Sequence, residues 1–192
     1  MDAAFYLVEY EWEDHGFPAF LSGTYNYPDF EWDVLNPDAS CQVPIVRSYE
    51  FHLTDPALSR LPFDFYDPRS PLVSRAFLSV CDELQVKYRA VPLKITFSAE
   101  GASPAAFFLF LPCQSEALLN REGSDYQEDR VVETGEVMRD KHFPQHPIYS
   151  WIRRFDVRPT SSHLFHCIEL LQLAIHEGKR ASAGGDEGDK RR

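Results

Sequence analysis

Residues 70–111 read SPLVSRAFLSVCDELQVKYRAVPLKITFSAEGASPAAFFLFL, and this stretch decides the fold class. Residues 70–84 predict an amphipathic helix, because their apolar side chains recur at the spacing of one helix face. These side chains are Val73, Phe77, Cys81 and Leu84. A serine at 70 or 74 can cap the helix. Residues 86–97 then predict a strand, and the wholly apolar residues 106–111 predict a short strand that is buried on both faces.

Upstream of this stretch the pattern favours strands and loops. Residues 3–12 and 43–53 predict strands, with Pro44 limiting the start of the second. Residues 22–40 are rich in Gly, Pro and Asn and predict loops, with short strands near Tyr25 and residues 30–34. The four prolines of residues 55–71 mark a connecting segment.

Downstream, residues 131–137 and 148–157 predict two further strands. Residues 163–177 predict a second helix with Gly178 as its C-cap, because apolar side chains recur on one helix face. They are Leu164, Ile168, Leu171 and Ile175. We therefore expect an α+β fold with a mostly antiparallel or mixed sheet and two main helices. We also expect one domain over residues 1–178 and a disordered tail over residues 179–192.

The chain has 192 residues and a formal net charge of −11. Nucleic-acid backbones and anionic membranes require Lys and Arg, so neither is expected as a direct partner. The four cysteines are widely spaced, with no CxxC pair: Cys41, Cys81, Cys113 and Cys167. They predict small buried hydrophobic side chains in a reducing cytosol. The acidic N-terminus does not look like a signal peptide, so we expect a cytoplasmic location. The sequence does not assign an oligomeric state.

Residues 1–46 contain nine carboxylates and ten aromatic rings but no Lys or Arg. Such a stretch favours a basic partner, with rings as anchors and carboxylates as steering charge. The predicted partner-binding residues are Glu9, Glu11, Trp12, Glu13, Asp14, Asp29, Glu31 and Asp33. The competing interpretation is a solvated sheet surface with core aromatics, in which case the partner docks elsewhere, for example near residues 125–129.

Catalytic and cofactor motifs are missing from the sequence, so we expect a protein that is not an enzyme and has no cofactor or metal. His142 and His146 have the spacing of a metal pair on a helix, but Pro144 between them forbids that helix. His163 and His166 lie three residues apart, and no further ligands accompany them.

Three stretches resemble a family of bacterial immunity proteins that was first catalogued as a domain of unknown function. The stretches are PLVSRAFLSVCDELQVKYRAVPLKI, FFLFLPCQSEALLNREGSDYQ and IYSWIRRFDVRPTSSHLFHCIELLQLAIHEG. The carrying motifs are Val73-Ser74, Val91-Pro92, the segment 118–124 with Tyr126, and the aromatic-arginine pattern before the last predicted helix. The resemblance covers residues 70–178. The Pro-rich residues 55–71 and the end of the chain depart from the pattern.

Members of this family are found beside nuclease toxins in polymorphic toxin systems. The resemblance implies an α+β fold and neutralisation of a toxin by direct binding, with no catalytic residues to carry over. We therefore expect an immunity protein that binds a cognate basic toxin, such as a nuclease, in the producing cell. The alternatives are a hydrolase that uses Asp140, His142 and His146, and a secretion adaptor or chaperone.

Overall fold

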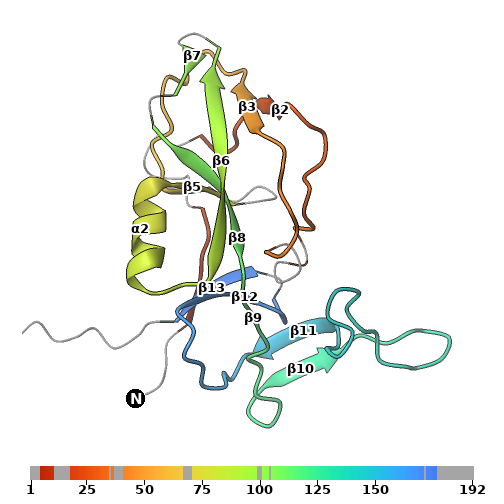
Figure 1. Cartoon of the computed structure of the whole chain (residues 1–192). Coiled ribbons are helices and arrows are strands. Elements are labelled where there is room, and N and C mark those ends of the chain that lie inside the picture. The colour runs from red at the N-terminus through yellow and green to blue at the C-terminus, as the bar shows by residue number, and fades with distance from the viewer. Residues whose placement is uncertain are drawn as a thin grey trace, which may run out of the picture.

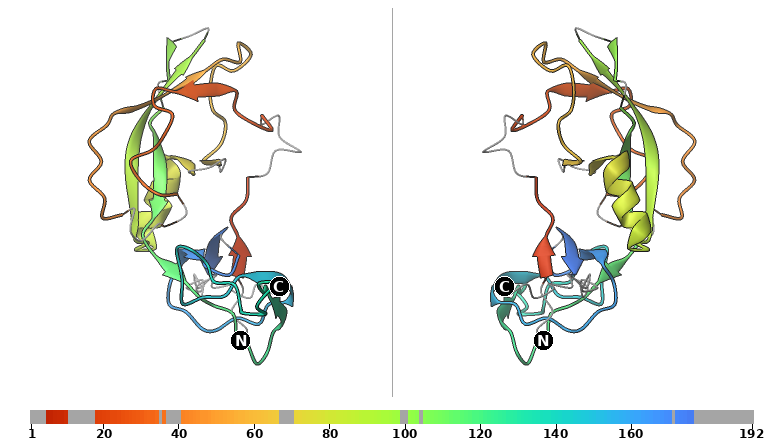
Figure 2. Two further views of the ribbon diagram at one scale, coloured as in Figure 1. Left: turned by 90° about the vertical axis from the view of Figure 1, so that its right-hand side faces the viewer. Right: turned by 90° about the vertical axis from the view of Figure 1, so that its left-hand side faces the viewer.

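The computed structural model describes residues 5–10, 18–34, 36, 41–66, 71–98, 101–103, 105–170 and 172–176. Its larger sheet contains β2 (Gly23–Tyr25), β3 (Tyr49–Leu53), β4 (Phe65–Tyr66), β5 (Leu72–Ser74), β6 (Tyr88–Phe97), β7 (Gly101–Ala102) and β8 (Phe107–Pro112). The strand order is β2-β3-β6-β8-β5-β4, with β7 paired to β6. The sheet is strongly curled, as the two side views in Figure 2 show.

The centre of this sheet is the antiparallel pair β6–β8, which runs from Tyr88 opposite Pro112 to Leu93 opposite Phe107. The first five residues of β8 are all buried. This confirms the prediction of an apolar strand covered on both faces. β3 lies parallel to β6 on the other side, so the sheet is mixed.

The single α-helix of the described residues, α2 (Arg75–Glu83), covers one face of the sheet (Figure 1). The Ser74 hydroxyl accepts a hydrogen bond from the Phe77 backbone N–H at 3.2 Å and donates one to the Asp64 carboxylate at 2.5 Å. This N-cap confirms a helix within residues 70–84, although Leu72–Ser74 belong to β5. The helix ends before Gln85, whose φ of 54° lies in the left-handed region.

A second sheet has the order β1-β13-β12-β9. Its strands are β1 (Phe5–Leu7), β9 (Ser115–Glu116), β12 (Leu164–Cys167) and β13 (Gln172–His176). The predicted helix over residues 163–177 is therefore wrong. Leu164 and Ile175, two members of the supposed helical stripe, are cross-strand partners in an antiparallel pair. All four residues of β12 are buried, so the apolar run reflects a strand covered on both faces.

The antiparallel strands β10 (Asp125–Glu128) and β11 (Tyr149–Arg154) complete the fold. β11 confirms the strand expected within residues 148–157. Residues 131–137, expected as a strand, instead form a tight turn that Arg130 and Val137 close with an isolated bridge. The connection formed by residues 129–148 includes a loop that extends away from both sheets (Figure 1).

These elements correct the fold class. The described part of the chain is mostly β, with two sheets, a strand pair and one short helix, so the expected α+β fold with two main helices is wrong. The expected strand over residues 3–12 is realised as Phe5–Leu7, and no strand forms at residues 30–34. The predicted C-cap at Gly178 and the tail of residues 179–192 lie outside the described residues.

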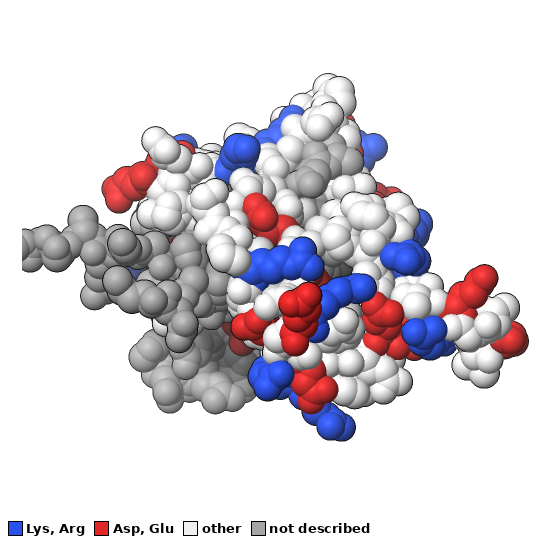
Figure 3. Space-filling model, turned by 90° about the horizontal axis from the view of Figure 1, so that it is seen from below, with Lys and Arg blue, Asp and Glu red and all other residues white. Residues whose placement is uncertain are grey.

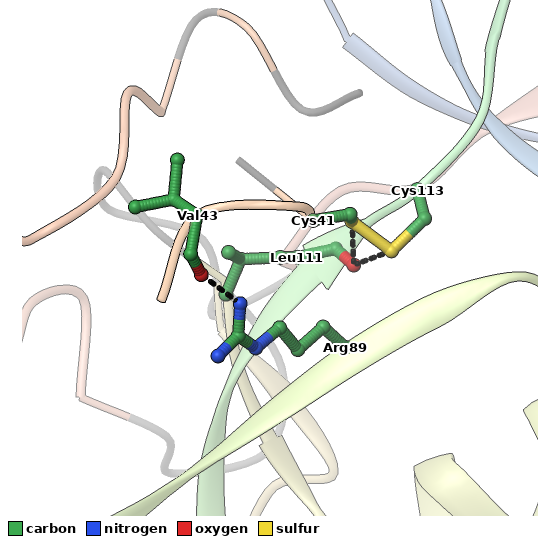
Figure 4. Close-up of a disulfide and its surroundings, with 5 residues drawn as sticks. All are labelled: Cys41, Val43, Arg89, Leu111 and Cys113. Atoms are coloured by element: carbon green, nitrogen blue, oxygen red, sulfur yellow. Dashed lines mark hydrogen bonds between the residues drawn. A yellow bond between two sulfur atoms is a disulfide. The ribbon is translucent and has the colours of Figure 1, made fainter. Parts of the chain in front are cut away.

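A disulfide joins Cys41 to Cys113, with their Cα atoms 5.5 Å apart and 72 positions between them in sequence (Figure 4). The prediction of four reduced cysteines is therefore wrong for this pair. The bridge ties the loop after the N-terminal segment to the end of β8. Beside it, the Arg89 guanidinium donates a hydrogen bond to the Val43 carbonyl, which holds the same loop against β6.

The other two cysteines are buried thiols, as predicted for Cys81 and Cys167. Burial raises the pKa of the Cys81 thiol to about 11 and that of the Cys167 thiol to about 12. Thiols with such pKa values stay protonated at neutral pH and are unreactive.

Candidate functional site

The predicted partner-binding residues of the N-terminal segment lie in several different environments. Glu9, Asp29 and Asp33 are exposed, and Glu31 is half-buried. The remaining four, Glu11, Trp12, Glu13 and Asp14, lie outside the described residues.

Glu31 is engaged within the chain. Its carboxylate accepts hydrogen bonds from the backbone N–H groups of Val46 and Arg47, at 3.3 and 2.9 Å, and from the Tyr49 hydroxyl at 3.3 Å. The Glu31 backbone N–H donates in turn to the Tyr49 hydroxyl oxygen at 2.9 Å. Glu31 thus holds the N-terminal segment against the start of β3. Both of its carboxylate oxygens already accept hydrogen bonds from this chain.

These contacts set the pKa of Glu31. Partial desolvation alone would raise it, but the hydrogen bonds from Arg47, Val46 and Tyr49 lower the pKa on balance below its ordinary value of 4.5. Because the folded-state pKa is depressed, the ionised form stabilises the fold above the unfolded-state pKa, and this contribution is lost as pH falls through the folded-state pKa.

We expect Glu31→Gln to reduce stability at pH 7. The difference from the wild type should shrink as pH falls below 4.5 and through the lowered pKa. Urea unfolding at a series of pH values measures this, with Glu83→Gln as a control that removes the same charge from the exposed end of α2. A constant difference between Glu31→Gln and the wild type at every pH would contradict the role of the ionised carboxylate.

The rings of the N-terminal segment mostly belong to the core. Trp32 is 6% exposed and stacks on Phe30 at a ring-centroid distance of 4.6 Å, and both pack against Tyr49. Tyr10, Tyr25 and Tyr27 pack against the same core. These rings therefore fit the competing interpretation, in which the aromatic side chains of this segment are core residues. Among the rings of this segment whose exposure the structure describes, Tyr6 and Phe20 are the exposed ones, at 56% and 70%.

Asp33 brings the N-terminal acidic segment into contact with the β10–β11 connection. Its carboxylate lies 3.3 Å from Nδ1 of His142, an ion pair when that ring is protonated. The neighbouring Phe143 is buried and lies beside the ring of His166. Residues 142–143 therefore anchor the connection to the body of the protein.

Asp140, a residue of the hydrolase alternative, has a structural role in the same turn. Its carboxylate accepts hydrogen bonds from the backbone N–H groups of His142 and Phe143, at 2.7 and 2.9 Å. An aspartate that closes a turn onto its own backbone in this way is explained without catalysis.

The tip of the β10–β11 connection is an ordered hairpin of residues 130–137, which we call the acidic hairpin. Its backbone bonds join Val131 N–H to the Glu136 carbonyl at 2.9 Å and Gly135 N–H to the Val131 carbonyl at 2.8 Å. Gly135 adopts a φ of 71°, which the turn requires. The Arg130 guanidinium closes the loop by donating to the Gly135 carbonyl at 2.9 Å.

This hairpin presents an apolar side chain to solvent. Val132 is 94% exposed, and the same hairpin carries the exposed Glu133 and Glu136. Residues 122–141 together carry seven carboxylates against three basic side chains. The sequence analysis named only the neighbouring residues 125–129 as an alternative docking site. It predicted a strand over residues 131–137, so the exposed position of Val132 was missed.

Charge on the face seen from below is mixed, with Lys and Arg side chains interspersed among Asp and Glu (Figure 3). A uniformly acidic surface therefore does not explain recognition on this face. Local projections such as the acidic hairpin offer a more selective contact.

Within the described residues, no group of three or more His, Cys, Asp or Glu side chains could hold a metal ion. None of the helices formed by these residues has the length and apolar character needed to cross a membrane. No protein-family model and no curated protein matches this chain.

Proposed function

We propose that this protein binds and neutralises a basic protein toxin, as an immunity protein does. The proposal rests on the net charge of −11 and on the sequence resemblance over residues 70–178. Nucleases fit as the toxin class because they must carry a cationic surface to hold a polyanion. An acidic binder competes with nucleic acid for that surface, and long-range attraction speeds its capture of the toxin.

One observation carries the assignment of the binding surface: Val132 is 94% exposed in an internally hydrogen-bonded hairpin that also carries Glu133 and Glu136. A single exposed valine is ordinary on a protein surface. A valine at the tip of a projecting, internally hydrogen-bonded loop is better suited to enter a cleft, because little conformational entropy is lost on binding. The carboxylates of Glu133 and Glu136 complement a basic rim around such a cleft.

The contact of Asp33 with His142 joins the N-terminal segment to the β10–β11 connection that carries the acidic hairpin. The proposed interface therefore combines the acidic hairpin with Asp29 and Asp33, which are exposed members of the set predicted from sequence. Glu31 supports it indirectly by holding residues 29–33 against β3.

Neutralisation inside the producing cell places the protein in the cytoplasm. The Cys41–Cys113 bridge is of the kind that an oxidising compartment preserves, so this feature argues against the proposed location.

The test is to co-express the chain with the product of the adjacent gene, purify the complex and measure association kinetics at low and high salt. We expect Glu133→Lys combined with Glu136→Lys to slow association about tenfold at low salt, because exposed charges act mainly through steering. The difference should shrink at high salt. Val132→Asp should instead accelerate dissociation, since it places a charge at the apolar tip.

The matched control is Glu83→Lys with Glu122→Lys, which changes net charge equally at exposed positions outside the hairpin. If both double variants slow association equally, the hairpin has no special role. If Glu11→Lys with Glu13→Lys slows association and the hairpin variant does not, the N-terminal segment is the site. Failure of the adjacent gene product to bind the wild type would overturn the immunity function itself.

A further inference from the structure

A polar cavity of about 280 Å³ lies at the base of the β10–β11 connection. Three arginines from separate segments line it: Arg121 from the β9–β10 link, Arg139 from the connection and Arg158 after β11. Tyr149 and His146 complete its polar wall. Three guanidinium groups around one cavity are unexpected on a protein whose net charge is −11.

The two carboxylates that line the cavity are already engaged. Glu128 pairs with Arg121 at 2.6 Å. Glu169 accepts hydrogen bonds from the backbone N–H groups of Leu118 and Leu119, at 3.1 and 3.0 Å. Neither forms an ion pair with Arg139 or Arg158 within the described residues, and the three arginines of the lining outnumber its two carboxylates.

Arg139 and Arg158 retain most of their hydrogen-bonding capacity. One Arg139 nitrogen donates to the Gln145 carbonyl at 3.0 Å, and within the described residues neither arginine has an ion-pair partner. Each guanidinium group carries five N–H donors, so each of the two arginines can form bidentate hydrogen bonds with an oxyanion.

Tyr149 adds a further donor. Burial raises the pKa of its hydroxyl, which keeps it protonated at neutral pH even though the Arg121 guanidinium beside it acts in the opposite direction. The Arg121 guanidinium interacts with the Tyr149 oxygen, and a protonated hydroxyl can donate to an anion in the cavity.

We propose that this cavity binds a small oxyanion, a phosphate or carboxylate group, held by Arg139 and Arg158 with Arg121 and Tyr149 as supporting donors. Charge-assisted hydrogen bonds from paired guanidinium groups are the strongest that side chains offer to such anions. The cavity volume lies near the lower end of the range for ligand pockets, which suits a small anion or the anionic end of a larger molecule. This inference does not depend on the proposed toxin-binding function.

The experiment is calorimetric titration of the purified full chain with inorganic phosphate and, separately, with malonate, in chloride buffer at constant ionic strength. We expect saturable binding of at least one anion, weakened about tenfold or more by Arg139→Gln with Arg158→Gln. Binding of phosphate alone identifies a phosphate site, and equal binding of malonate identifies a general oxyanion site.

The control is Arg60→Gln with Arg153→Gln, which removes the same charge from arginines that do not line the cavity. Equal weakening by both pairs, or no saturable binding of either anion to the wild type, would overturn the proposal. Circular dichroism checks that the variants fold. Arg158→Gln alone, at an exposed side chain, serves as the second variant if the pair does not fold, and unchanged binding by it would also count against the site.

Discussion

Replacing Cys41 and Cys113 together by serine is expected to lower the free energy of unfolding by about 4 kcal/mol, the chain-entropy cost of releasing a loop of this length. The bridge closes a 72-residue separation, so it restricts the unfolded chain strongly. For a chain of this size the melting temperature should fall by about 10 °C. Urea unfolding of oxidised wild type and variant, without reductant, measures the difference.

The wild type treated with a thiol reductant is the internal control, and its stability should fall to that of the double variant. Thiol labelling under denaturing conditions should find two free cysteines before reduction and four afterwards, since Cys81 and Cys167 are free. If oxidised wild type and variant unfold at the same urea concentration, the bridge does not form in solution.

Phe165→Ala is expected to cost about 3–5 kcal/mol, the usual range for removing a fully buried aromatic side chain. Phe165 is 0% exposed and forms a small core with Leu118 and Cys167. Chemical unfolding compared with Phe20→Ala, at a ring that is 70% exposed, provides a matched control. The control should change stability by no more than about 0.5 kcal/mol.

This comparison also separates the two interpretations of residues 163–177. On a helix whose apolar stripe runs through Leu164 and Ile168, Phe165 would lie one position to the side and could face solvent. On β12 it is enclosed. A cost no larger than that of the Phe20 control would therefore favour the helix and reject the strand pair.

The elements predicted correctly are those whose local signal is sufficient. Residues 106–111 are uniformly apolar and short, which a doubly covered strand explains without reference to other parts of the chain. α2 has both a helical apolar face and a serine cap, so two independent signals agree. Residues 86–97 lie between these two elements in sequence, and their prediction as a strand agrees with β6.

The elements predicted wrongly depend on distant partners. Apolar residues in the segment 164–175 satisfy helical spacing, but they also satisfy two short buried strands, and periodicity alone cannot separate these cases. The deciding contact is with β1, which lies at the other end of the sequence. The Cys41–Cys113 disulfide was missed for the same reason. The sequence does not show that these two cysteines lie close together in space, so their redox state was predicted from the expected cytosolic location.

The candidate sites show a similar division. Composition indicated an acidic binder, and Asp29 and Asp33 are exposed as that prediction requires. Composition alone could not distinguish these two aspartates from Glu31. The hydrogen bonds that Glu31 accepts from residues 46, 47 and 49 exist only in the folded loop. The three arginines of the cavity lie 18 and 19 positions apart in sequence, and no local pattern connects them.

The pairing of β1 with β13 has a consequence for how the protein is made. Phe5 lies opposite His176 and Leu7 opposite Ala174, so the first strand emerges from the ribosome long before its partner exists. At a synthesis rate of about 5–20 residues per second, the wait is on the order of 10–30 seconds. Contacts this distant in sequence also form slowly once both strands are present. The second sheet, and the cavity that borders it, can therefore be completed only after residues 172–176 have left the ribosome.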